Sequence, residues 1–148
     1  MKILITGGAG FVGSHVAEYY ATKNEEVIVF DNLSRAELLG YETSNEMYNW
    51  NYLKRYGNIE LIKGDIRDAG TIKDAAKDAD VIIHTAVQTA VTTSLVDPRT
   101  DFEVNALGTF NVQDELHLWH KAVWRRGPRL GCLVHDCYFS WKANYNLR

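Results

Sequence analysis

Cysteine is scarce in this sequence, and Cys132 and Cys137 are the two present among 148 residues. Two cysteines do not suggest the disulfide framework of a small secreted protein. Long apolar runs are also missing, because no segment approaches the length that crosses a bilayer. Met1 and Lys2 lead straight into a strand-like run that is too short for a signal peptide. We therefore expect a cytoplasmic protein without a leader or a membrane span.

The sequence has little net charge, −3 in total, which gives no reason to expect nucleic acid or an anionic membrane as a partner. It also lacks internal repeats, low-complexity tracts and linkers. Charged residues make up 24% and apolar residues 46%, which are ordinary values for a globular chain. A chain of 148 residues is long enough for one domain with a sizeable core.

A glycine-rich stretch, Thr6–Gly13, lies between a short apolar run and a helical pattern. Its glycines fit two overlapping spacings, G-x-G-x-x-G from Gly8 and G-x-x-G-x-x-G from Gly7. A strand, a glycine turn and a helix in this order are typical of a dinucleotide fingerprint. The first glycine would permit the tight turn, Gly10 the close approach of a pyrophosphate, and Gly13 the packing of the helix. The anion would lie at the helix N-terminus, where free N–H groups favour negative charge.

An acidic residue ends the next predicted strand. Asp31 lies 18 positions after Gly13, near the distance at which an acid meets the adenosine ribose. A carboxylate there would accept hydrogen bonds from both ribose hydroxyls and repel a 2′-phosphate, so NAD is favoured over NADP. Arg35 is close enough to soften that preference. The alternatives are an ordinary glycine turn and a solvated turn acid.

Strand and helix patterns alternate along the chain. The expected strands are Lys2–Thr6, Glu26–Phe30, Ile59–Lys63, Asp80–His84 and a weaker fifth, Leu130–His135. The expected helices are Val12–Thr22, Glu46–Tyr56, Thr71–Ala79 and one that starts at Asp97-Pro98, with Phe102, Ala106, Leu107 and Phe110 facing inward. Right-handed crossovers then predict an α/β fold, a Rossmann-type doubly wound parallel sheet truncated after about the fifth strand.

The loop after the fourth strand, Thr85–Gln88, should face the nicotinamide half of a cofactor, because ligands of open α/β sheets bind outside the carboxyl ends of the strands. His84 precedes this loop on an apolar strand. For a histidine in that setting we favour a buried structural role over a catalytic one.

Five motifs occur in an order that resembles the extended short-chain dehydrogenase/reductases, specifically the NAD-dependent nucleotide-sugar epimerases and dehydratases. The motifs are TGGAGFVG at Thr6–Gly13, FDNLSR at Phe30–Arg35, GDIRD at Gly64–Asp68, HTA at His84–Ala86 and NALGT at Asn105–Thr109. The run Val91–Ser94, followed by Asp97-Pro98, is most similar to CDP-paratose (tyvelose) 2-epimerases and next to UDP-glucose 4-epimerases. The resemblance covers about residues 1–112.

The resemblance implies a set of binding residues. Those for the cofactor are Gly7, Gly10, Phe11 and Val12 at the pyrophosphate; Asp31, Asn32, Ser34 and Arg35 at the adenosine ribose; Asp65 and Ile66 at the adenine; Thr85, Ala86 and Val87 along the nicotinamide ribose; and Asn105 on the helix beside that loop. Thr93 and Ser94 would begin the loop that faces the sugar substrate.

The resemblance also implies the chemistry. NAD takes a hydride from a sugar carbon, a Tyr of a Tyr-x-x-x-Lys pair removes the hydroxyl proton, and the keto sugar receives the hydride on its other face. The implied partner is a nucleotide sugar, a CDP- or UDP-hexose, and the family leaves room for a homodimer.

The family pattern is not recognisable after about Val112. Residues 117–148 carry a net charge of +5 against −8 for the remainder, and they hold both cysteines, three of four Trp and three of five His. We therefore expect an NAD-binding Rossmann domain at 1–112 and an atypical C-terminal tail at 113–148, native, spliced or frame-shifted, with the family's substrate domain absent. The chain would be incomplete as an enzyme; the alternatives are an NAD-binding module without turnover and an inactive truncated or frame-shifted product.

Catalytic and metal-binding residues stay unassigned in the tail. Tyr138 and Lys142 fit the Tyr-x-x-x-Lys spacing, but they follow the predicted fifth strand too closely and no Ser-rich strand end precedes them. The histidines and cysteines of the tail match no standard zinc spacing, so no metal is expected. They are His117, His120, Cys132, His135 and Cys137.

Overall fold

The computed structural model describes residues 1–34, 48–115 and 132–134 of the chain. Its parallel strands are β1 (Lys2–Thr6), β2 (Glu26–Asp31), β3 (Ile59–Lys63), β4 (Val81–His84) and β5 (Cys132–Val134), in the sheet order β3-β2-β1-β4-β5. The helices are α1 (Phe11–Thr22), α3 (Tyr48–Leu53), α4 (Ala69–Ala76), α5 (Val91–Val96), α6 (Pro98–Phe102) and the π-helical η1 (Glu103–Gly108), after which 109–115 are again helical.

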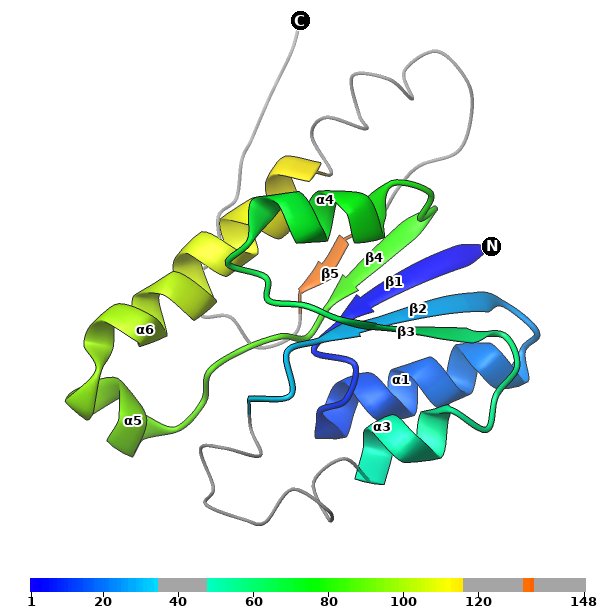
Figure 1. Cartoon of the computed structure of the whole chain (residues 1–148), viewed down its shortest axis with the longest axis horizontal. Helices are drawn as coiled ribbons and strands as arrows, with labels where there is room; N and C mark the ends of the chain where they lie inside the picture. Colours follow the sequence, from blue (N-terminus) through cyan, green and yellow to red (C-terminus); the bar gives the residue numbers. More distant parts are fainter. Residues whose placement is uncertain (35–47, 116–131, 135–148) are drawn as a thin grey trace, which may run out of the picture.

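Helices cover both faces of the sheet (Figure 1). Helices α1 and α3 pack on one face, where Ala17 and Leu53 join the side chains of β1 and β2. Helix α4 and the helical stretch 109–115 pack on the other face, through Ile72 and Val112. The predicted Rossmann-type doubly wound parallel sheet is therefore confirmed.

The central strand explains why the sheet needs both layers. Ile3, Leu4 and Ile5 are each completely buried, because successive side chains of β1 point to opposite faces. Ile3 and Ile5 contribute to the core under α1, whereas Leu4 contributes to the core under α4. Full burial of such a side chain stabilises a fold by about 1.5–3 kcal/mol. A continuous apolar run of this kind is what a parallel strand requires.

Helix α4 follows the predicted pattern. The Asp68 carboxylate caps it by accepting hydrogen bonds from the backbone N–H groups of Gly70 and Thr71. The predicted inward residues, Ile72, Ala75, Ala76 and Ala79, are all buried. The helix begins two residues earlier than predicted because Asp68 supplies the cap.

The predicted inward face of the helix after Asp97 is wrong. Phe102 is 66% exposed and Phe110 60%, and both Ala106 and Leu107 are also exposed. The inward stripe is instead small and partly polar, and it consists of Val104, Gly108, Asn111, Val112 and Glu115. A Cβ on Gly108 would lie 2.5 Å from Ile66 Cδ1, so this helix packs too closely for phenylalanine on that side. The prediction also assumed a regular 3.6-residue period, which the π-helical turn of η1 interrupts.

The remaining differences concern short elements. Thr93 and Ser94, which we expected to begin the sugar-facing loop, lie in the short helix α5 (Val91–Val96). The weak fifth strand is present as Cys132–Val134, and it pairs in parallel with β4. The predicted domain boundary at 112 falls inside the helical stretch 109–115 and stays a prediction.

Candidate functional site

The loops that follow β1 to β4 meet at one edge of the sheet, because the strands are parallel (Figure 1). Backbone hydrogen bonds join these loops beyond the strands. Gly7 N donates to Phe30 O at 2.8 Å, Gly64 N to Asp31 O at 3.1 Å, and Thr85 N to Thr6 O at 3.0 Å. In open α/β sheets this edge is where ligands bind.

Two glycines of the glycine turn, Gly7 and Gly13, are required because the surrounding backbone leaves no room for a side chain. Gly7 has a φ of 68°, and a Cβ there would lie 2.5 Å from the backbone N of Ala86. A Cβ on Gly13 would meet the carbonyl oxygen of Gly7 and, at 2.7 Å, the Cα of Gly8. Among the described residues, a Cβ on Gly10 would meet one atom within 4 Å, Gly7 O at 3.1 Å. A Cβ at position 10 is therefore less crowded than one at position 7 or 13, and a ligand lying close to the backbone would add a further reason for glycine there.

Helix α1 begins directly after this turn with its amides uncapped by side chains. Gly10 is the N-cap, and within the described residues the first turn contains no acidic side chain and receives no side-chain cap. Phe11 and Val12 are exposed on that turn. The N-terminus of a 12-residue helix with free N–H groups is a favourable position for a phosphate.

Asp31 ties the glycine turn to the end of β2. Its Oδ2 accepts a hydrogen bond from Ala9 N at 2.9 Å and its Oδ1 accepts one from Leu33 N at 2.8 Å. Burial raises the pKa of Asp31, while the two backbone N–H groups act in the opposite direction. The carboxylate is thus held beside the turn, as the predicted ribose acid would need to be.

Asp65, the predicted adenine-side acid, has a strong partner in Arg67, which lies two residues later in the GDIRD motif. Arg67 donates to both oxygens of Asp65, through Nε at 3.0 Å and a terminal nitrogen at 2.7 Å. These bonds hold the pKa of Asp65 down at about 2. Asn32 donates to Asp65 at 3.1 Å and accepts from Ser34 N at 3.0 Å, so the ribose-side and adenine-side residues form one network.

The loop after β4 is held from two sides. The Thr85 hydroxyl donates to Thr6 O at 2.7 Å, which fixes the loop to the end of β1. Asn105 then brackets the backbone of Gln88, because its Oδ1 accepts from Gln88 N at 2.8 Å and its Nδ2 donates to Gln88 O at 2.9 Å. Ala86 and Val87 lie between these two attachments.

His84 is buried under this loop and is neutral. The Thr109 hydroxyl donates to Asn105 O at 2.7 Å, so it accepts from His84 Nε2 at 3.0 Å. The other ring nitrogen, Nδ1, accepts from the Thr6 hydroxyl at 2.6 Å. Burial lowers the pKa of His84 to about 4. The side chain joins β1, β4 and the helix, which fits the structural role that the sequence favours.

The two predicted sugar-facing residues lie on α5. The Ser94 hydroxyl is 2.7 Å from Asp101 Oδ1 and 3.1 Å from Ala90 O, so it connects α5 to α6. Thr93 is half-buried beside it. Asp101 also accepts from Asn105 Nδ2 at 3.1 Å, so this amide nitrogen donates both to Gln88 O and to Asp101. The sequence did not single out Asp101, because acidic residues are common in the first turn of a helix, where they interact favourably with the free N–H groups.

Several candidates lie outside the residues that the structure describes. They are Arg35, Tyr138, Lys142, His117, His120, His135 and Cys137. Within 1–34, 48–115 and 132–134, no group of three or more His, Cys, Asp or Glu residues could hold a metal ion. In the same residues, no helix has the length and apolarity to cross a membrane.

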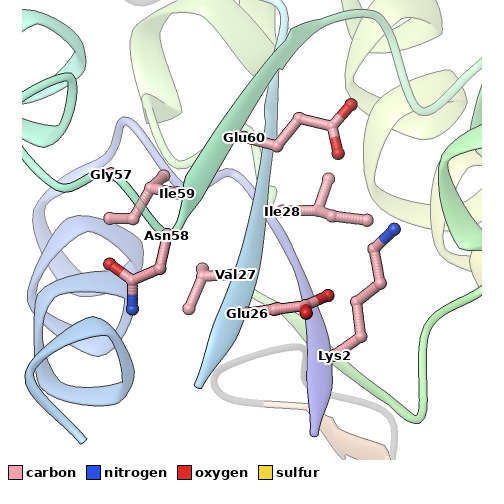
Figure 2. Close-up of a pocket in the computed structure, with 8 residues that line it drawn as sticks. All are labelled: Lys2, Glu26, Val27, Ile28, Gly57, Asn58, Ile59 and Glu60. Carbon is pink, nitrogen blue, oxygen red and sulfur yellow. The ribbon is translucent and has the colours of Figure 1, made fainter. Parts of the chain in front are cut away.

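A hollow of about 390 Å³ lies at the opposite edge of the sheet, where β1, β2 and β3 begin. Figure 2 shows the residues that line it. Lys2, Glu26 and Glu60 are its charged residues, and Asn58 also lines it. None of the predicted binding residues lines this hollow. The candidate site is therefore the loop cluster at the carboxyl edge.

Comparison with known proteins places the chain in a family. A family model described as GDP-mannose 4,6 dehydratase matches residues 4–123. The CDP-paratose 2-epimerase of Salmonella typhi is 37% identical over 122 residues, which cover 81% of this chain and 34% of that protein.

Two solved structures are similar in fold and sequence. The epimerase Mth375 of Methanothermobacter thermautotrophicus has a TM-score of 0.64 and 34% identity, over 79% of this chain and 32% of that one. The UDP-glucose 4-epimerase of Thermus thermophilus, solved in complex with NAD, has a TM-score of 0.62 and 30% identity, over 81% of this chain and 35% of that one. The chain spans about a third of the length of these relatives. Its match over residues 4–123 means that the chain belongs to the GDP-mannose 4,6 dehydratase family, among the nucleotide-sugar epimerases and dehydratases that its motifs indicate.

Proposed function

We propose that this chain binds NAD at the carboxyl edge of its sheet and supplies the cofactor-binding part of a nucleotide-sugar epimerase or dehydratase. One observation carries the proposal: the Ala9–Asp31 hydrogen bond of 2.9 Å holds a carboxylate beside an uncapped helix N-terminus. A pyrophosphate at α1 and a ribose at Asp31 would then be adjacent, as they are in a dinucleotide. The solved Thermus relative, a complex with NAD, supports this choice of cofactor.

We propose as binding residues those that the family resemblance implies. In the proposed complex the pyrophosphate is bound by Gly7, Gly10, Phe11 and Val12; the adenosine ribose by Asp31, Asn32, Ser34 and Arg35; the adenine by Asp65 and Ile66; and the nicotinamide ribose by Thr85, Ala86 and Val87, with Asn105 on the helix beside that loop. Bound NAD supplies a hydride acceptor, and the residues of this chain bind and orient it. Thr93 and Ser94 would border the sugar.

The preference for NAD over NADP tests this proposal. Asp31 would accept hydrogen bonds from the ribose hydroxyls and repel a 2′-phosphate, so calorimetry should show tighter binding of NAD. Asp31→Ala should move the ratio of the two dissociation constants toward one. Asp80→Ala is a matched control, because Asp80 accepts a hydrogen bond from Lys2 N at 2.7 Å at the opposite edge.

The control should keep the wild-type ratio even if its stability falls, since a ratio of affinities cancels a change in the folded fraction. Equal or tighter binding of NADP by the wild type would overturn the proposal. If the ratio of the NAD and NADP dissociation constants is unchanged in Asp31→Ala, Asp31 does not contact the adenosine ribose.

For the full reaction we propose hydride transfer between NAD and a carbon of a CDP- or UDP-hexose, through a keto intermediate. The names of the relatives, a CDP-paratose 2-epimerase and a UDP-glucose 4-epimerase, support this substrate class. We propose in addition that the 148-residue chain alone binds NAD without turning over nucleotide sugars. Two observations support this: the match covers about a third of each relative, and in the sequence Tyr138 and Lys142 follow the predicted fifth strand closely.

A homodimer is part of the same proposal. Phe102, Leu107 and Phe110 form an exposed apolar stripe along α6, η1 and the helical stretch 109–115. An exposed stripe of this kind favours contact with another protein surface. Sedimentation at micromolar concentration should show a dimer that Phe110→Asp dissociates; a monomeric wild type would contradict the proposal.

A further inference from the structure

Asn111 lies in the helical stretch 109–115 and is not one of the predicted binding residues, yet it is hydrogen-bonded to the loop that carries Asp65 and Ile66. It is 7% exposed, and its Nδ2 donates to Ile66 O at 2.9 Å and to Arg67 O at 3.1 Å. Both amino hydrogens of one buried amide are thus used on two successive carbonyls of the loop after β3. The contact fixes the orientation of two neighbouring peptide groups in that loop.

One of these peptide groups is held at both ends. The carbonyl of Ile66 accepts from Asn111, and the N–H of the same peptide, which belongs to Arg67, donates to Asp65 Oδ1 at 2.9 Å. Since a peptide group is rigid and planar, the position of Asn111 is transmitted to the Asp65 carboxylate. Without Asn111 the two carbonyls would have to turn toward other donors, and the Arg67–Asp65 bond would turn with them.

The side chain of Ile66 is fixed by the same helix. A Cβ on Gly108 would lie 2.5 Å from Ile66 Cδ1, so the helix backbone contacts this side chain directly. Ile66 is buried as a result. Backbone and side chain of one loop residue are therefore both positioned by a single helical turn.

This helix also holds the other half of the site, because Asn105 brackets Gln88 on the loop after β4. Two amides on one helix thus fix two loops that lie on either side of the glycine turn. The loop held by Asn111 carries the residues proposed for the adenine, and the loop held by Asn105 carries those proposed for the nicotinamide ribose.

We propose that Asn111 is a positioning residue for the adenine end of the cofactor, and that its loss weakens binding of adenine nucleotides separately from the nicotinamide end. This inference rests on the proposed NAD site. Asn111 touches no ligand in this role; it acts through Asp65 and Ile66.

The test compares ADP with NAD, because ADP contains the adenosine and pyrophosphate and lacks the nicotinamide ribose. Asn111→Ala should weaken ADP and NAD by the same factor, about 5- to 30-fold, the range expected for losing one or two well-placed hydrogen bonds. Asn105→Ala should weaken NAD while ADP stays within about twofold of the wild type.

Asn58→Ala is the matched control. The Asn58 amide also donates to two backbone carbonyls, Ala21 O at 2.9 Å and Glu25 O at 2.7 Å, but at the edge of the sheet far from the site (Figure 2). Asn58→Ala should bind ADP within about twofold of the wild-type affinity, even if it lowers the melting temperature as much as Asn111→Ala does. Equal loss of ADP affinity in Asn58→Ala and Asn111→Ala would mean that Asn111 affects binding only through the overall stability of the fold, and it would overturn the inference.

Gly108→Ala provides a second route if Asn111→Ala does not fold, because it displaces Ile66 without removing a hydrogen bond. It should also weaken ADP. If the wild type binds neither ADP nor NAD, the proposed function itself fails. If the wild type binds both, and either folded variant binds ADP like the wild type, this inference alone fails.

Discussion

Acidification from pH 7 to pH 5 should destabilise the fold through His84. The ring is buried between Thr6 and Thr109, and burial lowers its pKa to about 4. In the unfolded chain a histidine has a pKa near 6.5. Between these two values the unfolded state binds a proton that the folded state does not, so stability is lost as the pH falls.

The magnitude follows from the two pKa values. A lowering from 6.5 to about 4 corresponds to about 3 kcal/mol in total, at about 1.4 kcal/mol per pKa unit. About 2 kcal/mol of this should be lost between pH 7 and pH 5, because the unfolded histidine is almost fully protonated at pH 5 and the folded one is still mostly neutral. Such a loss is a sizeable fraction of the stability of an ordinary domain.

Urea unfolding followed by tryptophan fluorescence measures this loss, since Trp50 of α3 is buried in the core cluster that includes Ala17 of α1. His84→Gln replaces the imidazole with an amide, which can donate and accept hydrogen bonds but does not titrate, so the variant should lose about 2 kcal/mol less stability than the wild type over the same pH range. Asp31 and Glu115, whose pKa values burial raises, act in the opposite direction and are present in both proteins. Equal pH dependence in the two proteins would refute the reasoning.

Three further predictions concern the glycine turn, turnover and the domain boundary. Gly13→Ala should cost about 1–3 kcal/mol by overpacking against the backbone of Gly7, whereas Gly10→Ala should lower the urea midpoint less than Gly13→Ala does and should lose NAD affinity in calorimetry. The purified chain should not convert CDP- or UDP-hexoses; turnover that Tyr138→Phe abolishes would contradict this and identify that residue as catalytic. If the family-like unit ends near residue 112, the backbone amides of Cys132–Val134 should exchange with deuterium faster than those of Val81–His84. Equal protection of the two strands would contradict a domain boundary at that position.

The sheet and the glycine turn could be predicted because their signals are local. A run such as Ile3–Ile5 can be buried on both faces only in a central parallel strand, and the turn after it needs glycine at positions 7 and 13 for steric reasons visible in their spacing. Asp31 was found in the same way, by its distance along the chain from the turn. In each case a few neighbouring residues define the element.

The supporting contacts could not be predicted because they join residues far apart in sequence. Asn111 reaches a loop 44 and 45 positions earlier, and nothing around it distinguishes this amide from a surface asparagine on a helix. Arg67 was visible in the GDIRD motif, but its two-point bond to Asp65 depends on the turn between them. Sequence patterns therefore identified the loops and left out the groups that orient them.

The error on the helix after Asp97 has a physical cause that bears on the site. Inward faces are usually assigned to the largest apolar residues, here Phe102 and Phe110, because their burial contributes most to stability. At this helix, close approach to the loop after β3 takes precedence: Gly108 brings the backbone onto Ile66, and Asn111 can then reach two carbonyls. A phenylalanine in that stripe would push the helix away and break both contacts. The small and polar inward stripe is therefore what allows one helix to hold the loops at both ends of the proposed NAD site, and it leaves the aromatic stripe exposed on the opposite side.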